Sequence, residues 1–408
     1  MKGNAERGMR NSEWMTVRLG EVVELNPKGA VGNLADDTIV GFVPMAAVCE
    51  KDKAVIAPET RSYSEVKKGY TPMRNGDVIV AKITPCFENG KVAVVDTGYE
   101  YAFGSTEFHV FRATGEVDQR LIYHLLRSKQ VIAKGRDHMK GAAGQKRVPA
   151  EFFRAFEFRV PRSLSAQRRI AAILDKADAI RRKRRESLRL ADQFLRSVFL
   201  DMFGDPVTNP KGWEVHPLSS VLDDSFRNGI SPSNRGVVEG KVLTLSAITS
   251  GKFIPSAVKP AVFERIPSDN QRVTRDTFLI CRGNGSRNLV GVGVFPTKEM
   301  SDVALPDTMI ASTIDKVRIE PLFLEAVWST PKVRQQIESG ARTTNGTYKV
   351  NQKLLLGVEF PLPDMKLQSE YARISESIIR SKSIASTLAD ESDNFFISLQ
   401  QRAFQGEL

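Results

Sequence analysis

The sequence has 408 residues, of which 41% are hydrophobic and 26% are charged, so the chain can bury sizeable cores and is not a disordered tail. Its 59 Lys and Arg residues outnumber its 48 Asp and Glu residues, which gives a net charge of +11. This excess predicts a polyanionic partner, with nucleic acid ahead of an acidic membrane surface. At about 150 residues per domain, the length favours two or three domains.

The sequence predicts a cytoplasmic protein without a membrane segment. No stretch approaches the roughly 20 uninterrupted apolar residues that a membrane helix needs. The first residues, up to Glu13, are polar, so we expect no secretory signal. The three cysteines, Cys49, Cys86 and Cys281, are far apart and form no CxxC pair, which predicts reduced thiols.

Signatures of catalysis are missing from the sequence. None of the four histidines belongs to an HExxH motif, and no GxxxxGK(S/T) or GxSxG motif occurs. The Asn-Pro pairs at Asn26 and Asn209 are each followed by Lys, whereas an adenine methyltransferase needs Pro and then an aromatic residue. We therefore predict no catalytic residue and no metal site in this chain.

Along the chain, short patterns recur at a spacing of about 200 residues. Sequence identity between the two copies is low, so the repeat predicts two modules with one framework and different details. The matching pairs are Trp14 and Trp213, 43–48 and 243–248, 78–82 and 278–282, and Val160-Pro161 and Leu362-Pro363.

Each copy begins with short β-rich runs, such as 78–83 and 278–281, which Gly, Pro and Asn interrupt. Each copy ends with a long proline-free stretch, for which we predict a single helix. The fold class expected is therefore α+β, with two mixed α/β domains and two long helices. The predicted parts are a domain at 1–162, a helix at 163–205, a domain at 206–363 and a helix at 364–408.

Apolar residues three or four positions apart continue along both helices, which predicts an antiparallel coiled coil with a pseudo-twofold internal repeat. The alternative is that each helix packs only on its own domain. The predicted seam consists of Ile170, Ile173, Ala177, Ile180, Leu188, Ala191, Leu195, Val198, Ile374, Ile378, Ala385, Leu388, Phe395 and Leu399.

Charges near the middle of the two helices favour this antiparallel pairing. The first helix carries the basic run Arg181 to Arg185, and the second carries Asp390, Glu391 and Asp393. With the helix midpoints level, the two clusters would meet and would set register and orientation. Alternatively, the basic run is solvated, or it contacts a partner subunit or phosphates.

Several longer motifs resemble those of one known family, the specificity subunits of type I restriction–modification enzymes. The resemblance extends from Trp14 to the C-terminus. The motifs that carry it are Phe42-Val-Pro-Met-Ala-Ala-Val48, 76–91, 104–109, Met202-Phe-Gly-Asp-Pro206 before Lys211-Gly-Trp213, and Ala403-Phe-Gln-Gly-Glu-Leu408.

The resemblance implies a non-catalytic subunit with two target-recognition domains, each binding one half of a split, asymmetric duplex DNA site. It also implies docking of two modification subunits and of restriction subunits, which translocate and cut DNA. S-adenosylmethionine for adenine-N6 methylation, ATP and Mg²⁺ are expected on those partners, and no cofactor is expected on this chain. The alternatives are a self-sufficient DNA modification or cleavage enzyme with an unrecognised site, and a basic scaffold for RNA or proteins.

Polar loops that follow predicted strands are the candidate DNA-binding segments, because Lys and Arg suit phosphates while Asn, Gln and Arg suit base edges. For any one residue, a solvated turn is the alternative. Lys82 and Arg282 are favoured because the repeat places like charges at like positions. The candidates are Lys82, Thr84, Asn89, Lys91, Gln145, Lys146, Arg147, Arg227, Asn228, Ser231, Ser233, Asn234, Arg282, Asn284, Ser286, Arg287, Asn288, Arg342, Thr343, Thr344, Asn345, Tyr348 and Lys349.

Overall fold

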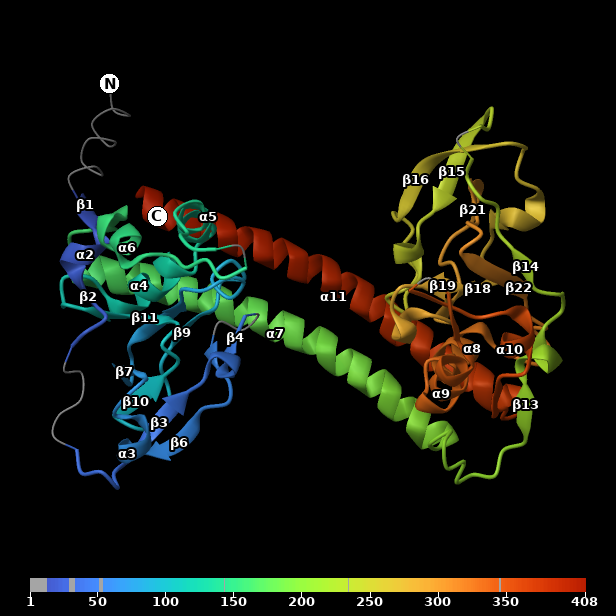
Figure 1. The fold of residues 1–408 in the computed structure, drawn as a ribbon, viewed down its shortest axis with the longest axis horizontal. Coiled ribbons are helices and arrows are strands. Elements are labelled where there is room, and N and C mark those ends of the chain that lie inside the picture. The colour runs from blue at the N-terminus through green and yellow to red at the C-terminus, as the bar shows by residue number, and fades with distance from the viewer. Residues whose placement is uncertain (1–12, 29–33, 51–53, 143, 234, 345) are drawn as a thin grey trace. The chain divides into compact units, whose positions relative to one another are not determined.

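The computed structural model describes residues 13–28, 34–50, 54–142, 144–233, 235–344 and 346–408 (Figure 1). The chain forms two compact units. The first unit comprises residues 1–187 together with 385–408, and the second comprises 188–384. The two long helices, α7 (Leu164–Phe203) and α11 (Met365–Gln405), therefore each contribute one part to either unit.

The first unit contains two four-stranded sheets. The inner sheet has the order β2-β11-β8-β9, and the outer sheet has the order β6-β3-β10-β7, in which only β3 and β10 are parallel. The strands are β2 (Val23–Leu25), β11 (Phe108–Ala113), β8 (Val78–Ala81), β9 (Val92–Val94), β6 (Glu59–Ser62), β3 (Ile39–Val43), β10 (Tyr101–Gly104) and β7 (Thr71–Arg74). Two short ladders join β1 (Trp14–Arg18) to β12 (Glu157–Pro161) and β4 (Val48–Cys49) to β5 (Ala54–Val55).

The second unit repeats this topology. Its inner sheet has the order β14-β22-β18-β20, and its outer sheet has the order β16-β15-β21-β17, with β15 and β21 parallel. The strands are β14 (Arg227–Asn228), β22 (Met309–Thr313), β18 (Thr277–Cys281), β20 (Gly293–Val294), β16 (Val258–Phe263), β15 (Val238–Leu243), β21 (Met300–Ala304) and β17 (Arg272–Val273). β13 (Val215–Pro217) pairs with β25 (Glu359–Pro361), as β1 does with β12. The predicted internal repeat is thus confirmed in the topology of the two units.

The short helices begin at recognisable capping signals. The Asp118 carboxylate accepts a hydrogen bond from Arg120 N at 3.0 Å at the start of α4, and α8 and α9 begin with proline. The first unit has α2 (Leu19–Val22), α3 (Tyr63–Val66), α4 (Gln119–Leu126), α5 (Lys129–Asp137) and α6 (Ala150–Ala155). The second has α8 (Pro321–Trp328), α9 (Pro331–Gly340) and α10 (Gln352–Leu356). Single 3₁₀ turns lie at Met45–Ala47, Leu218–Val221, Leu245–Ala247, Asp269–Gln271 and Arg287–Leu289.

The ends of the long helices belong to the domain cores. In the first unit, Leu174 of α7 and Phe396 of α11 are buried in one cluster with Phe111 of the inner sheet. In the second unit, Phe203 of α7 packs against Phe323 of α8 with ring centroids 4.9 Å apart. Full burial of such a side chain contributes about 1.5–3 kcal/mol, so each domain holds its helix ends firmly. Packing on the domains and pairing of the helices therefore occur together.

The helices run antiparallel, as predicted. In the first unit, an Arg184 Nη1–H donates to the carbonyl oxygen of Leu388 at 2.7 Å, and Arg185 forms an ion pair with Asp393. In the second unit, Asp192 of α7 forms an ion pair with Lys382 of α11. Residue numbers therefore rise along α7 while they fall along α11 in each unit (Figure 1).

The predicted meeting of opposite charges is confirmed through Asp393. Asp393 is half-buried, and its carboxylate lies beside Arg185 and 3.7 Å from Arg181. Asp390 and Glu391, by contrast, are exposed. Asp393 therefore meets the basic run on the buried side of α11, which the adjacent acidic residues do not reach.

The predicted seam is wrong at four positions. Ile173, Ile180, Leu388 and Phe395 are 41%, 45%, 42% and 61% exposed. The buried face of α7 instead includes the polar residues Asp178 and Arg181, and it turns toward the domain as well as toward α11. A stripe drawn from apolar residues alone therefore has the wrong phase. Of the other seam residues, two are buried (Ile170 and Leu399) and the rest are half-buried (Ala177, Leu188, Ala191, Leu195, Val198, Ile374, Ile378 and Ala385).

Candidate nucleic-acid interface

Two polar segments predicted in the first half lie side by side at the end of β8. The Lys82 N–H donates to the Glu107 carbonyl oxygen at 2.8 Å, and the Lys82 carbonyl oxygen accepts from Val148 N at 2.9 Å. Two residues further on, Thr84 N donates to the Lys146 carbonyl oxygen at 2.9 Å. The loop after β8 and the loop before α6 therefore form one surface, which we call the first loop cluster (82–91 and 145–147).

Side chains of the first loop cluster differ in how free they are to meet a ligand. Gln145 and Lys146 are exposed, and Lys82 is half-buried. Asn89 is also exposed, but its Nδ2 donates to a carboxylate oxygen of Glu50 at 3.2 Å. The Lys91 ammonium instead donates to the carbonyl oxygen of Met45 at 3.0 Å. It therefore helps to shape the loop, because its charge faces the domain.

Arg147 forms the tightest polar contact of this cluster. Its Nε and Nη2 donate to the two carboxylate oxygens of Glu107 at 2.9 and 2.8 Å, and these hydrogen bonds hold the pKa of Glu107 below its usual range. Its Nη1 donates to the Gln145 carbonyl oxygen at 3.1 Å, and Thr84 Oγ1 lies 3.9 Å from the sulfur of Met139. A phosphate would therefore compete with Glu107 for the Arg147 guanidinium. Glu107 was missed from sequence because a carboxylate is not an expected DNA ligand.

The end of β18 in the second unit carries the same backbone arrangement. Arg282 N donates to the Thr308 carbonyl oxygen at 2.9 Å, and the Arg282 carbonyl oxygen accepts from Val350 N at 2.9 Å. Its guanidinium Nη1 also donates to the Asp307 carbonyl oxygen at 3.3 Å. Arg282 thus occupies in the second unit the place that Lys82 occupies in the first.

A small sheet joins the two later candidate loops of the second unit. β19 (Gly283–Asn284) pairs with β24 (Thr347–Lys349), which also pairs with β23 (Arg342–Thr344). Asn284 lies opposite Tyr348, and both are half-buried, whereas Arg342, Thr343 and Lys349 are exposed. We call residues 282–288 and 342–349 the second loop cluster. Thr344 lies opposite Thr347, and Asn345 lies outside the described residues.

The turn after β19 is largely exposed. Ser286, Arg287 and Asn288 are exposed residues, and Ser286 N donates to the Asn284 side-chain oxygen at 2.9 Å. The Arg287 guanidinium donates twice to the Glu338 carbonyl oxygen, at 2.9 and 2.7 Å. Arg287 therefore fastens this turn to the end of α9, which leaves Ser286 and Asn288 as its more available side chains.

The third candidate segment, 227–234, approaches the second loop cluster through the turn at 305–309. Gly229 N donates to the Met309 carbonyl oxygen at 3.3 Å. A Cβ atom at Gly229 would lie 2.2 Å from the Pro306 carbonyl oxygen, so glycine permits this close approach. Asn228 and Ser231 are exposed beside it.

Two members of the third segment have structural partners. The Arg227 guanidinium donates to Thr277 Oγ1 at 3.3 Å, its side chain is 16% exposed, and burial lowers its pKa. Ser233 Oγ donates to a carboxylate oxygen of Glu264 at 2.8 Å. Both side chains are therefore engaged with the domain, and Asn234 lies outside the described residues.

Residues 11–190 match a family model described as the type I restriction modification DNA specificity domain. This part of the chain is therefore similar to the DNA specificity domain of type I restriction–modification systems. Two curated proteins of Escherichia coli are similar to part of the chain. The chain is 39% identical over 152 residues to the type I restriction enzyme EcoEI specificity subunit and 41% identical over 145 residues to the EcoAI specificity subunit.

These matches cover 36% and 35% of this chain and 25% and 24% of the two relatives. The match therefore spans about a quarter of the full length of each curated relative. The fold is similar over 96% of both chains to a solved S subunit of a type I restriction-modification system from M. genitalium, with a TM-score of 0.57. At 12% identity, that likeness concerns the fold alone.

Two further findings concern the described part of the chain. Within it, no helix combines the length and the apolar character that crossing a membrane requires. The same residues contain no group of three or more His, Cys, Asp and Glu side chains arranged to hold a metal ion.

Proposed function

We propose that the chain is the DNA sequence-specificity subunit of a type I restriction–modification complex and has no catalytic role of its own. In this proposal the first and second loop clusters each bind one half of a bipartite, asymmetric duplex site. The observation that carries it is the equivalence of Lys82 and Arg282. Both follow equivalent strands, β8 and β18, of the four-stranded sheets β2-β11-β8-β9 and β14-β22-β18-β20, and both make matching backbone hydrogen bonds, yet the residues around them differ.

The chemistry of the loops supports duplex DNA as the ligand. The net charge of +11 favours a polyanion. Cationic side chains such as Lys146 and Lys349 suit phosphates, and exposed amides such as Asn89 and Asn288 suit base edges. Two similar but non-identical readers on one chain suit a site whose halves differ, as half-site spacing follows from paired readers in other DNA-binding proteins.

The partners and cofactors form part of the same proposal. Two modification subunits and the restriction subunits would assemble on this chain, and they would carry S-adenosylmethionine, ATP and Mg²⁺. The repeat supports two copies of the modification subunit, because two units of the same topology can offer two matching surfaces. The cytoplasm is the location that such an assembly requires.

Methylome sequencing of cells that contain the chain and its modification subunits tests the proposal. We expect one methylated motif made of two defined halves separated by a fixed gap. Lys82→Ala should weaken or relax recognition of one half only, and Arg282→Ala the other half only, by about 1–3 kcal/mol where the side chain reads a base. Lys129→Ala, an exposed position on α5 outside the loop cluster, is the control.

Other outcomes would favour the alternatives. A motif without a gap, or loss of the same half in both variants, would contradict two separate readers. Methyl transfer by the purified chain alone, from labelled cofactor, would favour a self-sufficient enzyme. Preferential binding of RNA over the bipartite duplex would favour an RNA scaffold.

A further inference from the structure

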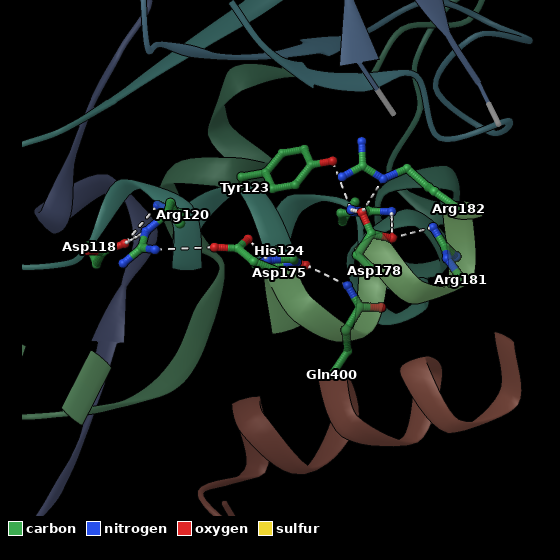
Figure 2. Close-up of polar contacts among 10 residues, drawn as sticks. Asp118, Arg120, Tyr123, His124, Asp175, Asp178, Arg181, Arg182 and Gln400 are labelled. Carbon is green, nitrogen blue, oxygen red and sulfur yellow. Dashed lines mark hydrogen bonds and ion pairs between the residues drawn. The ribbon is translucent and has the colours of Figure 1, made fainter. Parts of the chain in front are cut away.

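A buried ion cluster joins the end of α4 to α7 within the first unit (Figure 2). Arg127, which follows α4, donates from Nη1 and Nη2 to the two carboxylate oxygens of Asp178 at 2.7 and 2.9 Å. The two side chains are only 2% and 3% exposed. Arg181 lies 2.7 Å from the same carboxylate, and the Tyr123 hydroxyl accepts a hydrogen bond from Arg127 at 2.8 Å. Arg182 Nε lies 3.6 Å from the Asp178 carboxylate as well, so one carboxylate holds three arginines at the junction of the domain and the helix.

Further polar contacts, through His124, connect this cluster to α11. His124 is fully buried, and its Nε2 lies 2.8 Å from a carboxylate oxygen of Asp175 on α7. Gln400 of α11 donates from its side-chain amide to the His124 carbonyl oxygen at 3.0 Å (Figure 2). The guanidinium groups of Arg127 and Arg181 also lie 5.2 and 4.6 Å from the ring centre of Phe396 on α11. The domain, α7 and α11 therefore meet at one polar junction.

A chain of contacts links this junction to the first loop cluster. Gln119 of α4 donates to the Phe111 carbonyl oxygen at 2.9 Å and accepts from Ala113 N at 2.6 Å, which ties α4 to β11. β11 begins at Phe108, directly after Glu107, which holds both Lys82 and Arg147. The orientation of α4 on α7, which Arg127 helps to fix, therefore affects the position of the first loop cluster, the proposed DNA-binding surface.

The contribution of a buried ion pair is geometric more than energetic. Removing two charges from water costs about as much as their attraction returns, so replacing such a pair by well-packed apolar residues is often neutral. A two-pronged arginine–carboxylate contact nevertheless fixes both the distance and the plane of its partners. The Arg127–Asp178 pair therefore selects one orientation of α4 on α7.

The second unit lacks this pair at the equivalent position. Ile379 of α11 is equivalent to Asp178 of α7, because each follows the buried glutamine of its helix, Gln368 or Gln167, by the same number of positions. Ser329 is equivalent to Arg127, because each directly follows its short helix, α8 or α4. Ile379 is 47% exposed, and Ser329 is exposed. Together they border a cavity of about 740 Å³. Among the described residues of the second unit, no ion pair joins α8 to α11 there.

We propose that Arg127 and Asp178 are positioning residues, which hold the first loop cluster in one orientation on α7, while the second loop cluster is held less rigidly. This inference rests on the proposed function for its consequence, the gap between the two DNA half-sites. The first unit would provide the fixed reference, and the second would adjust to the duplex.

Spin-label distance measurements on the full chain test the positioning role without DNA. Labels on Gln130 of α5 and Lys183 of α7, both exposed, report the domain against its helix in a Cys49→Ser, Cys86→Ser background. The double variant R127M/D178L replaces the pair with apolar residues of similar size. We expect the distance distribution to broaden by about twofold. The melting temperature should fall, because Arg181 loses the Asp178 carboxylate and is left with Asp393 at 3.7 Å. An equally narrow distribution in the folded variant would overturn the proposal.

Two further variants and a second pair of labels serve as controls for the spin-label measurement. R127K retains the charge but loses the two-pronged contact, so it should broaden the distribution partly, and it serves if the double variant does not fold. R154M breaks an exposed pair with Glu151 in the same domain and should change nothing. Labels on Gln335 of α9 and Ser381 of α11 in the wild-type second unit should already give the broader distribution, and a narrower one would contradict the asymmetry.

The functional consequence is measured by methylome sequencing of the R127M/D178L complex. We expect the half-site sequences to be retained while sites with a gap one base pair shorter or longer become methylated. A merely structural role would lower methylation at the native gap without adding new gaps. If the wild-type complex yields no two-part motif, the proposed function fails, and the spin-label result still decides the positioning role.

Discussion

Gln167 and Gln368 make the same set of hydrogen bonds at the starts of α7 and α11, although the sequences around them differ. Both are fully buried. In each case the side-chain amide donates to two carbonyl oxygens and accepts from one backbone N–H, which ties a domain to the helix that follows it. The partners are Pro161, Glu116 and Asp118 for Gln167, and Pro363, Arg318 and Glu320 for Gln368.

Replacing either glutamine with methionine should loosen one unit and spare the other. Each change leaves three backbone groups without their partner, at a cost of about 1–3 kcal/mol for each group that stays buried. Hydrogen exchange should rise in α4 for Gln167→Met and in α8 for Gln368→Met. Gln193→Met, at an exposed position of α7, is the control. Equal loosening of both units by either variant would contradict this expectation.

The sequence predicted the features that depend on repetition and periodicity. The two modules, both long helices and the equivalence of Lys82 and Arg282 follow from patterns that recur at one spacing. The phase of α7 was wrong because its buried face contains Asp178 and Arg181, which pair with each other and with Arg127 and Asp393, residues far away in the sequence. A periodicity of apolar residues carries no record of such partners.

The candidate loops show the same limit. Residue type and position after a strand identified the surfaces, and the structure brings the two parts of each loop cluster together. Which cations are already engaged could not be predicted. Lys91 donates to Met45 and Arg147 to Glu107, and each partner comes from another part of the chain.

The half-buried Glu325 should make the second unit less stable at alkaline pH. Burial raises its pKa to about 7, although Phe295 N donates to its carboxylate. Between pH 4.5 and 7 the folded state keeps a proton that the unfolded chain has released, so stability falls as pH rises and the loss is complete above pH 7. The full effect is about 3 kcal/mol.

Glu325→Gln should remove this loss, because a glutamine oxygen can still accept from Phe295 N. Hydrogen exchange of α8, followed from pH 5 to pH 8.5 with correction for intrinsic rates, should show a gain in protection that grows with pH. Glu376→Gln, on the exposed side of α11, is the matched control. A gain of equal size at every pH would mean that ionisation of Glu325 is not the cause.

Buried His124 should give the first unit the opposite pH dependence. Burial lowers its pKa below the usual 6.5, and its Nδ1 has no hydrogen-bond acceptor among the described residues. Below pH 6.5 the His124 imidazole therefore binds a proton in the unfolded chain but not in the folded state. The free energy of unfolding falls as pH falls. His109, also buried with a lowered pKa, contributes in the same direction.

His124→Gln should reduce this acid sensitivity without abolishing it, because His109 remains. The free energy of unfolding of the first unit is measured by denaturant titration at several pH values between 5 and 7.5, with hydrogen exchange of α4 as the probe. These values give the slope of stability against pH. His138→Gln, at an exposed position, should leave that slope unchanged. A slope that is identical in the wild type and in His124→Gln would show that His124 titrates normally.

Asp393 is the acidic residue on which pairing of α7 with α11 depends in the first unit. It meets Arg185 and lies near the largely buried Arg181, whose pKa burial lowers, so Asp393→Asn should destabilise the pairing by about 1–2 kcal/mol. Limited proteolysis within residues 181–187 should become faster. Asp390→Asn and Glu391→Gln are the matched controls, because these exposed neighbours lie away from the basic run. Equal cleavage of all three variants would mean that net charge along α11, and not the contact at Asp393, sets the register.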